Sequence, residues 1–127
     1  MTYIDRSDLY SAIRGSWSRT TSVAPDGWSD SNPAWGQCAV TALVVQDALG
    51  GRIIRTVVGG TSHYFNLLPD GAEVDLTAEQ FGERLVRDGH EERTRDYLLS
   101  FPDTAQRYAA LKERFLARSA TAAASVS

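Results

Sequence analysis

The chain has 127 residues, of which 43% are hydrophobic, and this length and composition fit one globular domain with a substantial core. Its net charge is -3 and its thirteen basic residues are scattered rather than gathered into a stripe, so we expect neither nucleic acid nor a membrane surface as a partner. The single cysteine, Cys38, excludes an internal disulfide and lacks the companions of a structural zinc site, so the sequence predicts no metal and no cofactor.

The beginning of the chain has acidic residues and no long apolar run, which is typical of neither a signal peptide nor a membrane span. We therefore expect a cytoplasmic protein. Apolar side chains recur every four residues from Leu9 to Trp17, and this spacing predicts a short amphipathic helix over 5–17. Either Asp5 or Ser7 can cap its N-terminus.

Residues 18–36 are rich in Ser, Pro, Gly, Asp and Asn, which predicts a long loop of the kind that often carries function. From 38 to 49 the residues are almost uniformly apolar, and Gly50 and Gly51 follow as a helix C-cap signal. This pattern favours a buried central helix, although its β-branched residues also fit a strand. The next run, 52–58, predicts a strand.

Residues 62–77 have the pattern of a β-hairpin whose tip is Pro-Asp-Gly at 69–71. A loop of three residues places Phe65 opposite Asp75 and puts the odd-numbered residues of both strands, including His63, on one face. A two-residue Asp-Gly turn would instead turn one strand over relative to the other. We expect the three-residue form.

The hairpin is followed by a sequence pattern that is typical of a helix start. Thr77 can cap the amide three residues later and Gln80 can return the bond, so this capping box predicts a helix over 78–87. The stretch 87–96 is highly charged and has no apolar periodicity. It predicts a solvated connection.

The last part of the chain has the pattern of a helix and a tail. Apolar residues recur at helical spacing from Tyr108 to Leu116, with Asp103 as the expected N-cap, and they predict a C-terminal helix. Residues 119–127 are mostly Ala and Ser without a large core-forming side chain, which predicts a disordered tail. The sequence therefore predicts a single domain over 1–118.

Three chemically active side chains follow in the order Cys38, His63 and Asp75, at the start of the predicted helix and on the two paired strands. The N-terminus of a helix favours the thiolate form of a cysteine, because its unpaired N–H groups attract negative charge. A neighbouring imidazole takes the thiol proton and returns it to a leaving group, while a carboxylate fixes the tautomer of that imidazole. The order therefore permits a catalytic triad of nucleophile, base and orienting acid.

Four stretches of the sequence resemble the YunG-like family of small bacterial proteins, and the resemblance runs from about residue 8 to residue 116. They are SWS (16–18), NPAWGQCAVTALVVQD (32–47), SHYFNLLPDGAEVDLT (62–77) and QF (80–81). Because these motifs are long and specific, they indicate membership of the family.

The segment GQCAVTALVVQDALGG, followed by HYFNLLPDG and EVDLT, also resembles the core of the transglutaminase-like branch of the papain-like thiol enzymes. This resemblance implies that Cys38 is the nucleophile, His63 the base and Asp75 the orienting acid. It also implies an α+β fold with a papain-like or transglutaminase-like core. In such a core, a central helix bearing Cys38 packs on a small antiparallel sheet, and helices from the N- and C-terminal parts flank it.

An oxyanion formed by attack of Cys38 on a carbonyl group needs fixed hydrogen-bond donors. The first expected donor is the backbone N–H of Cys38, helped by an N–H of the Trp35-Gly36 loop or by a side-chain amide. Gln37 can donate only where the chain is not yet helical, because neighbours on a helix point about 100° apart. We expect Trp35 to wall the cleft and Asn66 to bond nearby, although its even position puts it on the opposite strand face.

These residues support a cysteine-dependent enzyme that moves an acyl group from an amide, ester or thioester to water or an amine. The expected partner is a small-molecule, peptide or carrier-bound acyl substrate, and the oligomeric state stays open. The alternative is a non-catalytic binding or regulatory module that keeps the fold and presents the loop 18–35, and a third hypothesis is redox sensing by Cys38. Each residue also has a structural interpretation: a buried thiol, a His63 bonded to backbone, and an Asp75 that caps a helix.

Overall fold

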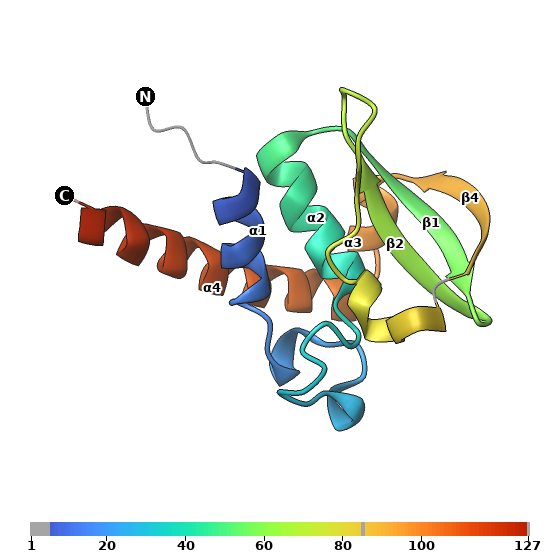
Figure 1. The fold of residues 1–127 in the computed structure, drawn as a ribbon, viewed down its shortest axis with the longest axis horizontal. Helices are drawn as coiled ribbons and strands as arrows, with labels where there is room; N and C mark the ends of the chain where they lie inside the picture. Colours follow the sequence, from blue (N-terminus) through green and yellow to red (C-terminus); the bar gives the residue numbers. More distant parts are fainter. Residues whose placement is uncertain (1–5, 85, 127) are drawn as a thin grey trace.

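The computed structural model describes residues 6–84 and 86–126 of the chain. This part of the chain is α+β, with four α-helices and one antiparallel sheet of four strands (Figure 1). The α-helices are α1 (Arg6–Arg14), α2 (Cys38–Leu49), α3 (Arg95–Leu99) and α4 (Pro102–Val126). The strands are β1 (Arg52–Val58), β2 (Thr61–Leu67), β3 (Glu73–Val74) and β4 (Arg87–Arg93). The connections include the 3-10 helices η1 (Arg19–Thr21), η2 (Pro25–Gly27) and η3 (Ala78–Arg84).

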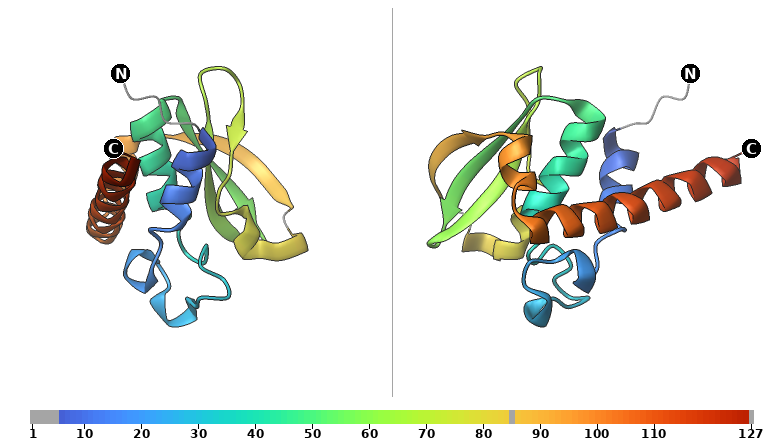
Figure 2. Two further views of the ribbon diagram at one scale, coloured as in Figure 1. Left: turned by 60° about the vertical axis from the view of Figure 1, so that its left-hand side comes forward. Right: turned by 180° about the vertical axis from the view of Figure 1, so that it is seen from behind.

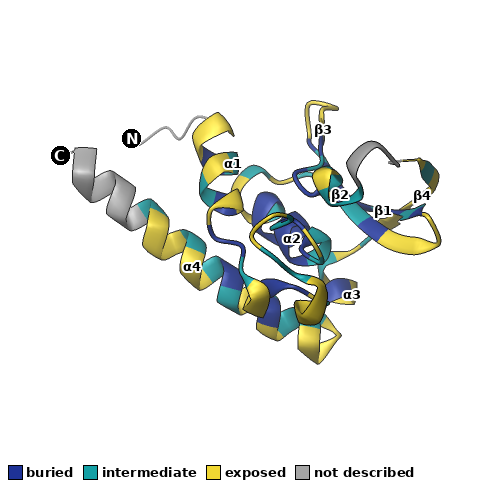
Figure 3. Cartoon of the chain, turned by 60° about the horizontal axis from the view of Figure 1, so that its bottom comes forward, coloured by how far each residue is buried: buried dark blue, intermediate teal, exposed yellow. Residues whose placement is uncertain are grey.

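The helix α2 is the centre of the fold. It has the sheet on one side and α4 on the other, and α1 closes the same apolar core (Figures 1 and 2). Residues 40–45 of α2 are all buried, and Figure 3 shows this run at the middle of the molecule. The helix ends before Gly50, whose φ of 73° is a conformation that glycine adopts at little cost. The bounds of this helix are those that the sequence predicts.

The helix α1 is present but shorter than expected, because it ends at Arg14 rather than at residue 17. Gly15, a poor helix former, follows directly. Trp17 is nevertheless buried, and its indole N–H donates to the hydroxyl of Thr41 on α2 at 2.9 Å. Asp5, one of the two expected N-caps, lies outside the described residues.

The strand order in the sheet is β3-β2-β1-β4, with antiparallel neighbours throughout. β2 and β3 form the predicted hairpin, in which Leu67 lies opposite Glu73. The N–H of Leu68 donates to the carbonyl of Ala72 at 2.8 Å, and Gly71 in the turn has a φ of 88°. The loop therefore has three residues, as predicted, and the expected register is confirmed.

The prediction that 87–96 is a solvated connection is wrong, because these residues form β4 and the start of α3. β4 is an edge strand whose side chains are mostly exposed, so it shows no alternation of apolar and polar residues. Ion pairs from its glutamates to β1 take the place of apolar contacts, as between Glu91 and Arg55 at 3.6 Å. α3 then begins after Thr94, whose hydroxyl accepts from the N–H of Tyr97 at 3.1 Å.

The helix expected over 78–87 is also different in the structure, because η3 is a 3-10 helix that ends at residue 84. The predicted capping box is not formed. The side chain of Gln80 bonds to the backbone of Gly36 instead of returning to Thr77. In this segment, the hydrogen bond between Gln80 and Gly36 therefore replaces the expected local cap at Thr77.

The helix α4 begins two residues earlier than the expected cap at Asp103 implies, and it continues further. Pro102 occupies its first position, which suits the fixed φ of proline, so Asp103 lies in the first turn and not at the cap. The helix runs through Val126, across most of the segment for which the sequence predicts a tail, and Ser127 lies outside the described residues. Alanine has the highest helix propensity, so an Ala-rich segment can extend a helix that has already formed. In the described chain, no helix combines the length and apolar character needed to cross a lipid bilayer.

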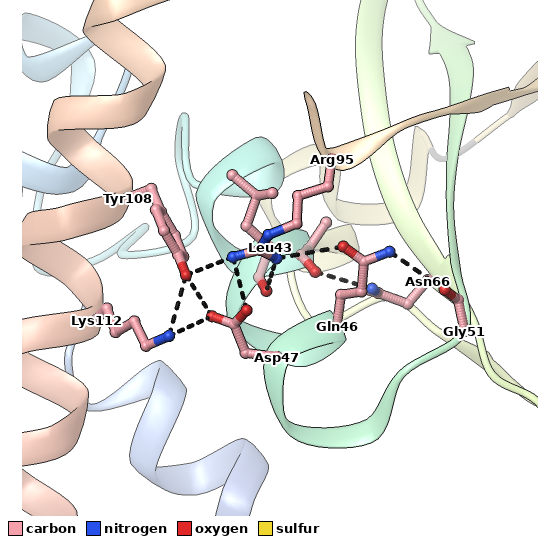
Figure 4. Close-up of polar contacts among 9 residues, drawn as sticks. Leu43, Gln46, Asp47, Gly51, Asn66, Arg95, Tyr108 and Lys112 are labelled. Carbon is pink, nitrogen blue, oxygen red and sulfur yellow. Dashed lines mark hydrogen bonds and ion pairs between the residues drawn. The ribbon is translucent and has the colours of Figure 1, made fainter. Parts of the chain in front are cut away.

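A polar network joins the C-terminal half of α2 to its neighbours (Figure 4). Asp47 on α2 pairs with Arg95 at 2.7 Å and with Lys112 on α4 at 3.0 Å. The hydroxyl of Tyr108 donates to Asp47 and accepts from Arg95 at 2.6 Å. On the sheet side, Asn66 donates to the carbonyl of residue 42 at 2.9 Å. These bonds fix α2, and with it the position of Cys38, relative to β2.

Candidate active site

His63 and Asp75, two residues of the predicted triad, form a direct hydrogen bond. His63 lies on β2 with no exposed surface, and its Nε2 atom lies 2.8 Å from Oδ2 of Asp75. An ionised carboxylate only accepts, so Nε2 is the donor. Asp75 follows β3 directly, and the register of β2 and β3, continued by one residue, sets it opposite Phe65. His63 is then its diagonal neighbour on the same face, which the three-residue turn predicts.

Arg87, at the start of β4, binds the same carboxylate. Its Nη2 atom donates to Oδ2 of Asp75 at 2.9 Å, and its Nη1 atom donates to Oε2 of Glu73 at 2.8 Å. Its guanidinium carbon lies 4.2 Å from the centroid of the Phe65 ring. No local pattern in the sequence predicts this contact, because it depends on the pairing of β4 with β1.

The charges in this cluster shift the titration of both triad residues. Burial acts to lower the pKa of His63, but the hydrogen bond to Asp75 and the interaction with Cys38 outweigh it and raise this pKa to about 9. Burial likewise acts to raise the pKa of Asp75, but the hydrogen bonds from His63 and Arg87 hold it below its usual value. At neutral pH His63 is therefore an imidazolium and Asp75 a carboxylate.

Cys38 is the first residue of α2, and its thiol is free and half-buried. Its side chain affects the pKa of both His63 and Tyr64, neighbours on β2, which places the thiol beside this part of the strand. The remaining ring nitrogen of His63, Nδ1, is buried and has no hydrogen-bond partner among the described residues. The contact with Cys38 helps to raise the pKa of His63, so the structure brings these two side chains next to each other.

The loop that leads into α2 was expected to supply oxyanion donors. The N–H of Gly36 is already used, because it donates to Oε1 of Gln80 at 3.1 Å. The N–H of Trp35 donates to the carbonyl of Asn32 at 3.1 Å, and the side chain of Trp35 is 37% exposed. The N–H of Cys38 belongs to the first turn of α2, where a helix offers no acceptor, so it is the expected donor that stays available.

The two side-chain amides expected near the oxyanion serve the fold instead. Gln37 is fully buried, its Nε2 atom donates to the carbonyl of Ser18 at 2.9 Å, and its Oε1 atom accepts from Thr21 at 2.7 Å. Gln37 therefore fastens the loop after α1 to the start of α2. Asn66 donates to the carbonyl of Ala42 from the strand face opposite His63, as its even position predicts.

The surroundings of His63 include an aromatic ring from η3. Phe81 packs edge-on against the imidazole, with the ring centroids 5.0 Å apart. On the same face, His90 packs in the same manner on Phe65 at 5.6 Å. Within 6–84 and 86–126, no three His, Cys, Asp or Glu side chains are gathered as a metal ion requires.

Comparison with known proteins identifies the family. The family described as YunG protein matches residues 5–120 of this chain. A protein of Bacillus subtilis (strain 168) with the name "Uncharacterized protein YunG" is 44% identical over 69 residues, which are 54% of this chain and 56% of that protein. The chain thus spans little more than half the length of this relative, and no solved structure matches it. Because the family match covers nearly the whole chain, the chain belongs to the YunG family.

Proposed function

We propose that this chain is a cysteine-dependent acyl-transfer enzyme that acts on a small-molecule, peptide or carrier-bound acyl substrate. The observation that carries the proposal is the 2.8 Å hydrogen bond between Nε2 of His63 and Oδ2 of Asp75, in a ring whose pKa the neighbouring Cys38 also raises and whose Nδ1 atom is not used by the rest of the described fold. Buried polar atoms normally have a hydrogen-bond partner. A buried imidazolium whose second N–H has no acceptor is suited to giving that proton to a reacting group.

In the first step, the sulfur of Cys38, as thiolate, forms a bond to the carbonyl carbon of an amide, ester or thioester. The bond from that carbon to the leaving nitrogen, oxygen or sulfur then breaks, and the leaving group takes the proton from Nδ1 of His63. The product is a thioester between Cys38 and the acyl group. Asp75 keeps its hydrogen bond to Nε2 throughout, so the ring holds one tautomer.

In the second step, His63 acts as the base. Its neutral Nδ1 atom takes a proton from water or an amine, and the resulting nucleophile attacks the thioester carbonyl. The carbon–sulfur bond breaks, and the sulfur leaves as the thiolate that began the cycle. Hydrolysis and transamidation differ only in the acceptor molecule.

The proposal includes a papain-like or transglutaminase-like core for this α+β fold. What supports it is the order of the elements: a helix that starts at the cysteine, a strand that carries the histidine, and an acid directly after the paired strand. A cytoplasmic location belongs to the same proposal, because a free reactive thiol persists best in a reducing compartment.

The test uses p-nitrophenyl acetate, an activated ester, with intact-mass spectrometry of the protein. We expect one acetyl group on the wild-type chain and none on Cys38→Ala. His63→Ala should slow acetylation by about 100-fold, the lower range for loss of a general acid–base. His90→Ala, which removes the other histidine of the chain, is the matched control and should leave the rate unchanged.

A second reagent separates chemistry from folding. Iodoacetamide at neutral pH should alkylate Cys38 faster than it alkylates free cysteine, and Asp75→Asn should reduce that advantage while circular dichroism shows an intact fold. Equal acetylation of wild type and Cys38→Ala would rule the proposal out. So would an alkylation rate that does not respond to the loss of His63.

The second candidate function is a non-catalytic binding or regulatory module. The full burial of the His63 imidazole favours it, because a side chain without contact to solvent can serve the fold alone. In that case Cys38 reacts with iodoacetamide no faster than free cysteine does. The two reagents together therefore decide between the candidates.

A further inference from the structure

Gln80 presents an unpaired amide group next to the loop that leads into α2. Its Oε1 atom accepts from the N–H of Gly36 at 3.1 Å, whereas its Nε2 atom is buried without a hydrogen-bond partner among the described residues. The orientation of this amide follows from chemistry, because the N–H of Gly36 can only donate and so must face the oxygen. The two Nε2 hydrogens therefore point away from Gly36 and are unsatisfied.

An unpaired buried donor costs about 1 to 3 kcal/mol, so its retention needs a reason. The position of Gln80 offers one. Gly36, its partner, stands two residues before Cys38 in the chain, and Phe81, its neighbour, packs on His63 with ring centroids 5.0 Å apart. This pair of residues in η3 therefore contacts both the approach to the nucleophile and the base.

We infer that Gln80 is an oxyanion donor of the proposed reaction, and this inference rests on the proposed function. As the sulfur of Cys38 bonds to the substrate carbonyl carbon, the π electron pair moves to the carbonyl oxygen, which becomes negative. The Nε2–H of Gln80 and the backbone N–H of Cys38 bind that oxygen. This electron pair then re-forms the carbonyl π bond, and the leaving group departs with the proton of His63. The oxygen is then neutral again.

The expected effect of this donor is large, because a donor held in place in a site shielded from water needs no reorganisation at the moment of reaction. Removal of one such donor slows acyl transfer by about 100-fold to 1000-fold. The effect belongs to the step in which the oxyanion forms. Reactions of the same thiol that form no oxyanion do not depend on the donor.

The test compares two reactions of Cys38 in Gln80→Glu. This variant keeps an oxygen for the N–H of Gly36 but has no N–H to donate. Acetylation by p-nitrophenyl acetate forms an oxyanion and should slow by about 100-fold or more. Alkylation by iodoacetamide displaces iodide without one and should stay within about threefold of wild type.

Two further variants control for charge. Gln80→Met, which is uncharged, should lose acetylation to a similar extent and keep alkylation. Gln106→Glu makes the same chemical change at an exposed position of α4 and should affect neither reaction.

An acetylation rate of Gln80→Glu equal to that of wild type would overturn the inference. An equal loss of both reactions in both Gln80 variants would also overturn it, because Gln80 would then only hold the loop. Absence of Cys38-dependent acetylation in the wild type would instead overturn the proposed function.

Discussion

Replacement of Asp75 by Asn should lower the pKa of His63 from about 9 and remove a pH-dependent part of the stability of the fold. Burial acts to lower this pKa, and the bond to Asp75 is the largest influence that opposes burial. The asparagine carries no negative charge, so burial has the larger effect on the pKa of His63. The imidazole then becomes neutral at a lower pH than in the wild type. The amide keeps nearly the same shape as the carboxylate, so the packing changes little.

The magnitude follows from linkage. A histidine titrates at 6.5 in the unfolded chain and at about 9 in this fold, and each pH unit of difference is about 1.4 kcal/mol, so the coupling is about 3 kcal/mol. Because the pKa in the folded state is raised, this stabilisation is fully present below pH 6.5 and is lost as the pH rises through about 9. Asp75 has the opposite sign, since its pKa is lowered and its stabilisation is lost only in acid.

The assay has two parts. Urea unfolding between about pH 6 and pH 10 should show the free energy of unfolding of the wild type falling by about 3 kcal/mol through the titration of His63, and that of Asp75→Asn falling by less. Proton NMR should follow the two histidines separately, with His90→Gln to assign the resonances. A pKa of His63 at or below 6.5 in the wild type would refute the reasoning. A difference in stability between the two chains that does not change with pH would refute it as well.

Two further predictions concern residues that hold the site in place. Gly36→Ala should destabilise the fold in urea unfolding by at least about 1 kcal/mol more than Gly71→Ala, because both have positive φ but only the new Cβ at Gly36 meets another group, the Ser22 hydroxyl. Equal losses would show that the contact at Gly36 relaxes freely. Trp17→Phe should cost about 2 kcal/mol or more in the same assay, because it leaves the buried hydroxyl of Thr41 without its 2.9 Å bond. Thr41→Val in the Trp17→Phe background should recover part of that loss, and no recovery would contradict the role of the bond.

The elements that local sequence determines were predicted closely. The helix over 38–49 has its exact bounds because an apolar run ends at a glycine that can adopt positive φ. The hairpin register followed from the turn at 69–71, and that register brings His63 and Asp75 together. The geometry of a turn depends on a few neighbouring residues, so a short stretch of sequence is enough to predict it.

The elements that distant residues determine were not predicted. β4 has the composition of a solvated segment, and only its pairing with β1 makes it a strand and brings Arg87 to Asp75. Gln80 fits a capping box with Thr77, yet its amide binds Gly36, a residue far away in the chain. A local sequence pattern does not show whether a side chain will cap a nearby helix or bond to a residue distant in the chain. The contacts of Arg87 and Gln80 therefore could not be predicted from the sequence.

The charges of the site suit the proposed reaction in one further respect. Before the reaction, Glu73, Asp75 and a thiolate at Cys38 carry negative charge, while Arg87 and the imidazolium of His63 carry positive charge. When a thiolate at Cys38 attacks, it loses its charge to the new carbon–sulfur bond while His63 gives up its proton. The total charge of the site is therefore the same before and after acylation. Acylation therefore leaves no additional uncompensated charge next to the buried ring of His63, where such charge is costly.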